Sequence, residues 1–222
     1  MELTPNLHAF LWSSPTVNNC NSYLMLSGMK RILIDPGHAS CFDHVSRGLA
    51  RLGLTSGDID LVMATHAHPD HVEAIQFFDR NRTLFALHER DWRLVKEMLP
   101  FLGASLSIGM ERFEPDFFLA EGELKVGDAT LEIYHTPGHS PGSITIYHSS
   151  ERALFTGDLV FRGGVGRTDI PGGDPELLKD SIRRISKIEA DWFLPGHGEP
   201  LSGADEIWAN FRQVERAWFG YL

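Results

Sequence analysis

Three histidines and one aspartate stand within six consecutive positions of the chain, and together they could bind metal ions. They are His66, His68, Asp70 and His71, in the run Thr-His-Ala-His-Pro-Asp-His at 65–71. Imidazole and carboxylate groups are ligands that suit zinc, iron and manganese. Four such groups cannot satisfy one tetrahedral ion without ligands from elsewhere in the chain. We therefore expect two metal ions.

An apolar run precedes this cluster and indicates how its side chains are positioned. Residues 61–64, Leu-Val-Met-Ala, predict a buried strand. Because side chains alternate along a strand, His66 and His68 would point to the same side, while Asp70 and His71 begin a curl toward a helix. The alternative is a polar surface turn in which each histidine is structural. The shared side of the two histidines favours a metal site.

Later in the chain, one turn sequence recurs after apolar runs. Pro-Gly-His occurs at 36–38, 137–139 and 195–197. Proline and glycine turn the backbone at the exit of a strand and leave the histidine beyond the sheet edge. Not all three need bind metal, and His139 and His197 are our candidates. Asp158, after Gly157, is another; such an aspartate often bonds its own backbone, but beside the histidines we favour a ligand.

The remaining sequence predicts alternating strands and helices, which is an α/β fold class. Gly53 and Pro100 are expected to end two of the helices. Residues 101–115 have no clean period and are a candidate loop or lid. The expected strands are 23–26, 31–35, 61–64, 83–87, 123–126, 129–134, 144–147, 153–156 and 192–194, and the expected helices are 42–52, 72–78, 89–99, 175–188 and 204–219.

Composition limits the kind of protein this can be. The chain has 222 residues, of which 42% are hydrophobic and 23% charged, as in ordinary globular proteins. This length suits a single domain spanning 1–222, and two half-sized lobes are equally permitted. The net charge of −10 argues against nucleic acid or an anionic membrane as the main partner, because both are bound by clustered Lys and Arg. A small-molecule substrate is expected.

The start of the chain and its cysteines predict the compartment. Met-Glu-Leu-Thr-Pro at 1–5 has no signal-peptide pattern, and no apolar run reaches the length of a transmembrane helix. We therefore expect a cytoplasmic protein. Cys20 and Cys41 form no Cys-x-x-Cys pair and no disulfide framework, and they are expected to be buried free thiols.

The pattern of ligands resembles the metallo-β-lactamase superfamily over nearly the whole chain. The resemblance rests on Thr-His-Ala-His-Pro-Asp-His, Pro-Gly-His at 137–139, Gly-Asp at 157–158 and Gly-His at 196–197. It implies a four-layer αββα sandwich with metals at one edge of the sheets. It also implies the following ligands: His66, His68 and His139 for the first ion, Asp70, His71 and His197 for the second, and Asp158 as the bridge.

Within that superfamily the chain is most similar to short forms of glyoxalase II, which are hydroxyacylglutathione hydrolases. Asp158 supports this, since β-lactamases of the superfamily lack a bridging aspartate there. Gly166–Asp174 resembles a loop of the short forms, and its Gly-Arg-Thr-Asp start also occurs in mononuclear iron persulfide dioxygenases, which are the alternative. A lactonase or other ester hydrolase is a further alternative, as is a metal-dependent binding module. Long forms carry a C-terminal glutathione-binding domain, and this chain ends soon after His197.

The resemblance implies a thioester hydrolase, possible substrates being S-acylglutathione and related thioesters. A hydroxide bridging two divalent ions, zinc first and iron or manganese as alternatives, would attack the carbonyl. Asp70 would both bind the second ion and orient the hydroxide. We do not expect Arg167 to be catalytic; the glycine-rich loop at 163–173 would line the site or join the two halves. No Gly-x-Ser-x-Gly elbow supports a serine nucleophile.

Several residues with similar chemistry are left out of the ligand set. Asp35 is usually structural in the superfamily, so its neighbour His38 is excluded. The other excluded histidines are His8, His44 and His148, expected in turns or at the surface, together with His88 and His135. The C-terminal helix carries Ile207, Phe211, Val214 and Trp218 on one face. Such a stripe most often packs on its own core, and a homodimer through this helix is the alternative.

Overall fold

The computed structural model describes residues 1–102 and 113–222, and its first half is built on a sheet of seven strands. The strands stand in chain order, with an antiparallel start and a parallel end from β4 onward. Their bounds are β1 Glu2–Thr4, β2 Leu7–Phe10, β3 Ser22–Ser27, β4 Lys30–Ile34, β5 Leu61–Met63, β6 Leu84–Leu87 and β7 Phe117–Phe118.

A second sheet of six strands forms most of the other half. Its order is β15-β14-β11-β10-β9-β8, and only the β11–β14 pair is parallel. Two further strands, β12 Val160–Phe161 and β13 Gly164–Val165, form a separate hairpin. The bounds in the sheet are β8 Gly122–Val126, β9 Ala129–His135, β10 Ile144–His148, β11 Ala153–Gly157, β14 Trp192–Pro195 and β15 Leu201–Ser202.

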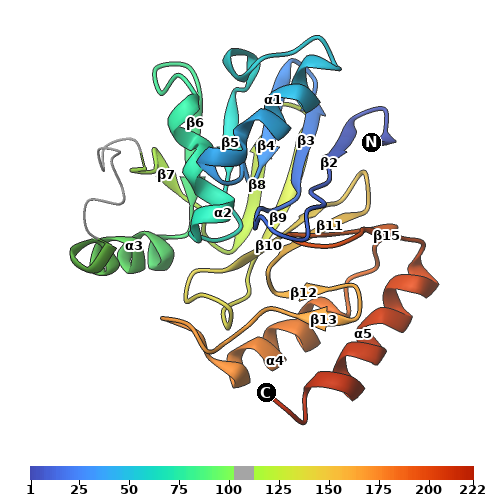
Figure 1. Cartoon of the computed structure of the whole chain (residues 1–222). Helices are drawn as coiled ribbons and strands as arrows, with labels where there is room; N and C mark the ends of the chain where they lie inside the picture. The colour runs from blue at the N-terminus through green and yellow to red at the C-terminus, as the bar shows by residue number, and fades with distance from the viewer. Residues whose placement is uncertain (103–112) are drawn as a thin grey trace.

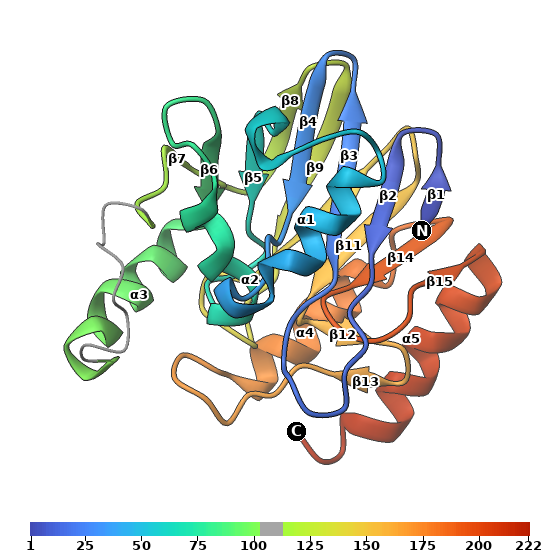
Figure 2. The ribbon, with the colours of Figure 1, turned by 45° about the horizontal axis from the view of Figure 1, so that its top comes forward.

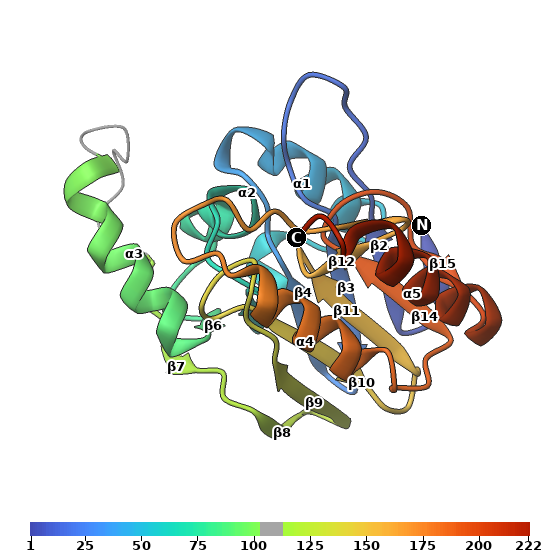
Figure 3. The same ribbon diagram turned by 90° about the horizontal axis from the view of Figure 1, so that it is seen from below.

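Helices cover the outer face of each sheet, and the result is the four-layer αββα sandwich that the sequence predicted (Figure 1). Viewed from below, α4 and α5 lie over strands of the second sheet (Figure 3). The helices are α1 Phe42–Ala50, α2 Pro69–Val72, α3 Glu89–Leu102, α4 Pro175–Ile185 and α5 Ala204–Trp218, with short 3₁₀ turns at Ala39–Cys41, Ser56–Asp58 and Glu73–Phe77. No helix within the two described ranges is long and apolar enough to cross a membrane.

The main core lies between the two sheets. Ile34 and Met63 of the first sheet and Ile146 of the second belong to one cluster of buried side chains. Tyr23 meets Phe155 edge-on across the layers, with ring centroids 5.4 Å apart. Burying each large apolar side chain contributes about 1.5–3 kcal/mol, so this layer holds the two sheets together. The site described below spans both sheets and depends on that contact.

The C-terminal helix packs on the second sheet through its apolar stripe. Ile207, Phe211 and Val214 are buried in the cluster that also contains Phe193 of β14. Trp218, the fourth residue of the stripe, is 41% exposed, and its indole nitrogen donates to the carbonyl of Gly163. The stripe therefore packs on the chain's own core, and a homodimer through this helix stays a prediction.

Three sequence expectations need correction or lie outside the description. The helix expected at 72–78 is the single turn of α2 followed by a 3₁₀ turn. Pro100 does not end α3, which continues to Leu102; a proline removes one helical hydrogen bond, and here only two residues follow it. Most of the loop or lid expected at 101–115 lies outside the described residues.

Two excluded histidines were also placed wrongly. His8 lies in β2 and His148 in β10, and both are buried rather than in turns or at the surface. His148 accepts a hydrogen bond from the amide of Glu151 through its Nδ1. The sequence predicted the strand of His148 one residue short, at 144–147, and predicted no strand at His8. Both strands are buried along their whole length, so they lack the alternation that marks a half-buried strand.

Candidate metal centre

The run 65–71 leaves the first sheet at the end of β5 and turns at once into α2. His68 has extended backbone angles and caps α2, and Pro69 occupies the first helical position, where its missing N–H costs nothing. Asp70 and His71 therefore lie in the first turn of that helix. Buried neighbours enclose them, and His66 and His71 are almost fully buried.

Three later side chains reach the same place from the second sheet. His139 follows β9, Asp158 follows β11 and His197 follows β14. Gly157, with φ +50°, passes so close to Thr65 that a Cβ there would stand 2.5 Å from the threonine Oγ1. Only glycine allows this approach, and it brings the end of β11 against the histidine run. The strand, glycine turn and polar residue predicted from the sequence are thus all present.

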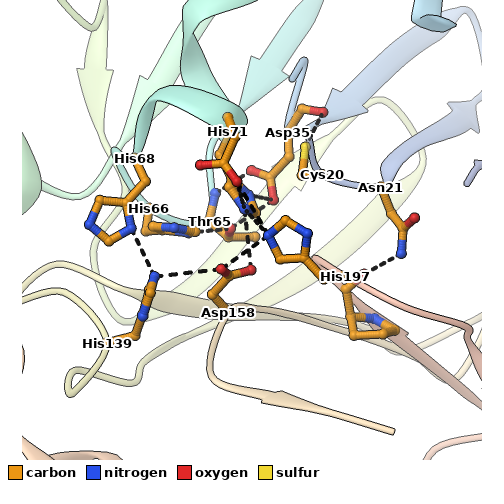
Figure 4. A network of polar contacts seen from close by, with 12 residues as sticks. Cys20, Asn21, Asp35, Thr65, His66, His68, His71, His139, Asp158 and His197 are labelled. Carbon is orange, nitrogen blue, oxygen red and sulfur yellow. Dashed lines mark hydrogen bonds and ion pairs between the residues drawn. The ribbon is translucent and has the colours of Figure 1, made fainter. Parts of the chain in front are cut away.

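All seven predicted ligands come together at the edge between the sheets. Figure 4 labels all of them except Asp70. One set, which we call the three-histidine group, consists of His66, His68 and His139, with potential ligand atoms within 4.8 Å of one another. His68 Nδ1 and His139 Nε2 are 2.8 Å apart. This arrangement matches the first ion implied by the family resemblance.

A second set, the mixed group, consists of Asp70, His71 and His197 and meets the same 4.8 Å criterion. His197 Nε2 is 3.3 Å from Asp70 Oδ2 and 3.5 Å from His71 Nε2. These atoms converge from α2 and from the end of β14, so the group joins the two halves of the molecule.

Asp158 lies between the two groups. Its Oδ2 is 3.6 Å from His139 Nε2 and 3.2 Å from His197 Nε2, and its Oδ1 is 3.2 Å from His71 Nε2. One carboxylate thus faces a histidine of the first group and two of the second. This is the position that a bridging ligand requires.

The polar atoms of the proposed ligands do not all find hydrogen-bond partners among themselves, and metal ions would satisfy those that remain. Among the described residues, His66 Nε2 is buried without a hydrogen-bond partner, and the buried Asp158 Oδ1 makes no contact shorter than its 3.2 Å ion pair with His71 Nε2. An unsatisfied buried polar atom costs about 1–3 kcal/mol, and native proteins carry few of them. Both atoms face the centre, where a cation would satisfy them. The residues present therefore fit divalent metal ions.

Hydrogen bonds behind the ligands fix which ring nitrogen faces the centre. His139 donates from Nδ1 to the carbonyl of Arg167, 2.8 Å away, which leaves Nε2 free. His71 Nδ1 lies 2.9 Å from Asp35 Oδ2, so its Nε2 faces the centre as well. Such outer partners orient metal-binding imidazoles and raise their basicity.

Asp35 is structural in a more specific sense than the sequence indicated. It is buried after β4 with φ +53°, and its oxygens accept from the amide and the hydroxyl of Thr65 as well as facing His71. The carboxylate therefore links the start of the histidine run to His71. The Pro-Gly turn after it could have suggested this position, but not its partner.

The two groups differ in their electrostatics. Burial lowers the pKa of His66 far below its usual value and lowers the pKa of His68 to about 4. Burial also lowers the pKa of His139. The three-histidine group is therefore neutral at pH 7, which is the form that binds metals.

Carboxylates reverse this pattern in the mixed group. Burial opposes charge on His197, but hydrogen bonds with Asp158 and Asp70 outweigh it and raise its pKa to about 9. Burial likewise opposes ionisation of Asp70, yet the bond from His197 and the charge of His71 hold the Asp70 pKa below its usual range. The pKa of Asp158 is lowered well below its usual value by the same two histidines, again against burial.

Arg167 contributes its backbone rather than its side chain. Its guanidinium is exposed and pairs with Asp169, while its carbonyl holds His139. The glycine-rich loop thus supports a proposed ligand through a backbone carbonyl, whereas the sequence led us to expect its amides and Arg167 to line the site or join the two halves. The six excluded histidines belong to none of the groups of potential metal ligands found among the described residues.

Asn18 is a site residue that the sequence gave no signal for. Its side-chain amide donates to Asp70 Oδ2 over 2.8 Å. It belongs to the loop between β2 and β3, which projects from the first sheet (Figure 2). Residues 12–19 of that loop, with His197 and Gly198, line an open cleft of about 670 Å³. A cleft of this size beside the ligands can admit a small molecule.

Comparison with known proteins identifies the family. Residues 15–197 match the family described as the metallo-beta-lactamase superfamily. The chain belongs to this superfamily, and it carries the histidine and aspartate groups of a metallo-hydrolase.

Individual relatives are similar over most of their length. A probable metallo-hydrolase of Methanocaldococcus jannaschii is 37% identical over 191 residues, which cover 81% of this chain and 87% of that protein. Hydroxyacylglutathione hydrolase GloC of Haemophilus influenzae is 34% identical over 185 residues, covering 80% and 84%. The structure of TTHA1623 in a di-iron-bound form is 31% identical, with a TM-score of 0.67, and the match covers 82% of this chain and 89% of that chain.

Proposed function

We propose that this protein hydrolyses thioesters, S-acylglutathione or a related compound, with the help of two divalent metal ions. The observation that supports the proposal best is the position of Asp158 between two groups of ligands. The likeness to a hydroxyacylglutathione hydrolase, GloC, supports the substrate class. Zinc is the metal we expect first, with iron or manganese as alternatives; the relative with a di-iron form supports iron as one of them.

The proposed ligands form two sets, one for each ion, which correspond to the two groups defined above. His66, His68 and His139 would hold one ion, and the mixed group would hold the other, with Asp158 shared. When bound, such a pair of ions supplies an activated water and a Lewis acid for the carbonyl oxygen. This chemistry suits thioesters, because a thiol is a far stronger acid than an alcohol and leaves readily as thiolate.

The side chains of the chain itself would orient the reactants. Asp70 is ionised and held by Asn18 and His197, so its carboxylate can orient the attacking water by accepting a hydrogen bond from it. The cleft lined by residues 12–19 would take the acyl or thiol part of the substrate. Asp70 is therefore the residue we propose as catalytic.

The persulfide dioxygenase alternative rests on the Gly-Arg-Thr-Asp run, and the contacts of this run do not favour it over a hydrolase. The Arg167 guanidinium pairs with Asp169 at the surface. The loop meets the ligands through a backbone carbonyl, which any residue could provide. The Gly-Arg-Thr-Asp run can therefore hold His139 in place in a hydrolase as well as in a dioxygenase.

One panel of assays tests the proposal. Protein reconstituted with zinc, iron or manganese would be offered S-lactoylglutathione, a simple acyl thioester, a lactone and glutathione persulfide. We expect thiol release from a thioester to exceed turnover of the lactone, without oxygen uptake. Oxygen uptake with the persulfide and no thioester hydrolysis would instead support the dioxygenase.

A further inference from the structure

A fully buried carboxylate outside the proposed ligand set joins the two loops that carry the three-histidine group. Asp91 lies in the first turn of α3 and has no exposed surface. It faces the run 65–71 on one side and the turn after β9 on the other. Asp91 is neither a proposed ligand nor the proposed catalytic residue.

Both oxygens of Asp91 accept hydrogen bonds from these two loops. Oδ2 accepts from the amide of Ala67 and from the hydroxyl of Ser140, each over 2.8 Å. Oδ1 accepts from the amide of Gly142 over 2.6 Å. Burial raises the pKa of Asp91, and the three hydrogen bonds, which favour the ionised carboxylate, offset part of that effect.

Two of the three donors are immediate neighbours of proposed ligands. Ala67 stands between His66 and His68, and Ser140 follows His139 directly. One carboxylate therefore holds the amide between the first two histidines and the hydroxyl beside the third. It links two loops that come from different sheets.

The packing around Asp91 is close enough to require glycine. A Cβ on Gly142 would stand 2.5 Å from the Asp91 amide nitrogen and 2.7 Å from Oδ1. Ser140 is held in turn by Ser143, whose Oγ lies 2.7 Å from the Ser140 Oγ. The turn after β9 is therefore fitted to the carboxylate on both sides.

We propose that Asp91 is a positioning residue that fixes the spacing of the three-histidine group and so its metal affinity. The inference rests on the proposed metal centre, and it concerns zinc binding rather than turnover. In Asp91→Asn, the amide cannot accept from all three donors at once. Outer partners of metal ligands are typically worth about 10–100-fold in affinity, and we expect a loss of that size at this group alone.

The experiment measures zinc occupancy at each group separately. Protein would be equilibrated in zinc–chelator buffers, and anomalous diffraction would report the occupancy of each group. In Asp91→Asn the three-histidine group should lose affinity by about 10–100-fold while the mixed group changes by less than about twofold. Equal loss at both groups, or no loss in the folded variant, would overturn the proposal.

Two further variants keep the test informative if Asp91→Asn does not fold. Gly142→Ala should weaken the same group by pushing against Asp91, and Ser140→Ala, a milder change, should weaken it by a smaller factor. Unchanged zinc affinity in a folded Ser140→Ala protein would count against the proposal.

Asp116→Asn is the matched control. Asp116 also accepts from a backbone amide, that of Phe85, and pairs with Arg80, but it touches neither ligand loop. It should lower stability and leave both zinc affinities unchanged. Since no substrate is used, a protein that binds zinc in this way but fails to cleave thioesters would refute the proposed function and leave the role of Asp91 standing.

Discussion

The two ligand groups are built from similar residues but differ in how they are supported. In the three-histidine group, the carbonyl of Arg167 holds His139, and Asp91 accepts from the amides of Ala67 and Gly142. In the mixed group, His71 faces the carboxylate of Asp35, and Asp70 is held by the amide of Asn18. The three-histidine group consists of neutral imidazoles, and its supporting carboxylate, Asp91, contacts backbone amides rather than the rings. The mixed group has a carboxylate, Asp70, among the proposed ligands themselves.

This difference teaches how one site can hold two ions in unlike surroundings. Imidazole suits zinc and iron, while added carboxylate also suits manganese. His197 of the mixed group lines the open cleft, so this group is accessible from it. We infer that the three-histidine group mainly holds its ion, and that the mixed group, through Asp70, orients the attacking water.

The largest effect should follow removal of the proposed catalytic carboxylate. Asp70→Ala should lower kcat for thioester hydrolysis by at least about 10²-fold without unfolding the protein, because misplacing a reacting group by about 1 Å costs that much. Steady-state kinetics and circular dichroism would measure the two effects. Asp169→Ala is the control, because Asp169 is an exposed carboxylate that pairs with Arg167. Equal activity in the two variants would contradict this assignment.

A smaller effect, greater at the mixed group than at the three-histidine group, should follow a change at Asp35. In Asp35→Asn the side chain can no longer accept from both Thr65 donors and support His71. We expect about 10–100-fold weaker metal binding at the mixed group, measured by chelator competition. Asp60→Asn is the control, since Asp60 accepts from the Arg31 amide far from the ligands. A loss confined to the three-histidine group would break the comparison.

The smallest effect is expected at Asn18. Asn18→Ala removes one hydrogen bond to a charged group, worth about 1.5 kcal/mol, so kcat/KM should fall by roughly tenfold. The ion content should stay the same, because Asn18 contacts a ligand and is not one itself. Asn6→Ala, which removes an exposed bond to Glu151, should have no effect. Loss of an ion from Asn18→Ala would show that the loop holds metal rather than orienting Asp70.

The sequence predicted the sheets and the ligands better than their supports. Each of the seven ligands follows an apolar strand or opens a short helix, and both features are local patterns. The partners of these ligands come from distant parts of the chain. Asn18 reaches Asp70 across 52 positions, and Asp91 reaches Gly142 across 51. Such pairs depend on how the two sheets pack, which a local pattern does not encode.

The misplaced elements have a similar cause. His8 lies in a strand that is buried along its whole length and so lacks an alternating pattern, and His148 is the last residue of a strand predicted to end at 147. Proline is unfavourable inside a helix, but Pro100 does not mark the end of α3, which continues to Leu102. Tertiary contacts decide such cases.

Anomalous diffraction from the metal-loaded protein tests the central claim most directly. We predict two peaks about 3.5–4 Å apart, the usual spacing of a two-metal site. One peak should be bound by His66, His68 and His139 and the other by Asp70, His71 and His197, with Asp158 touching both. A single peak, or peaks away from these side chains, would contradict the account.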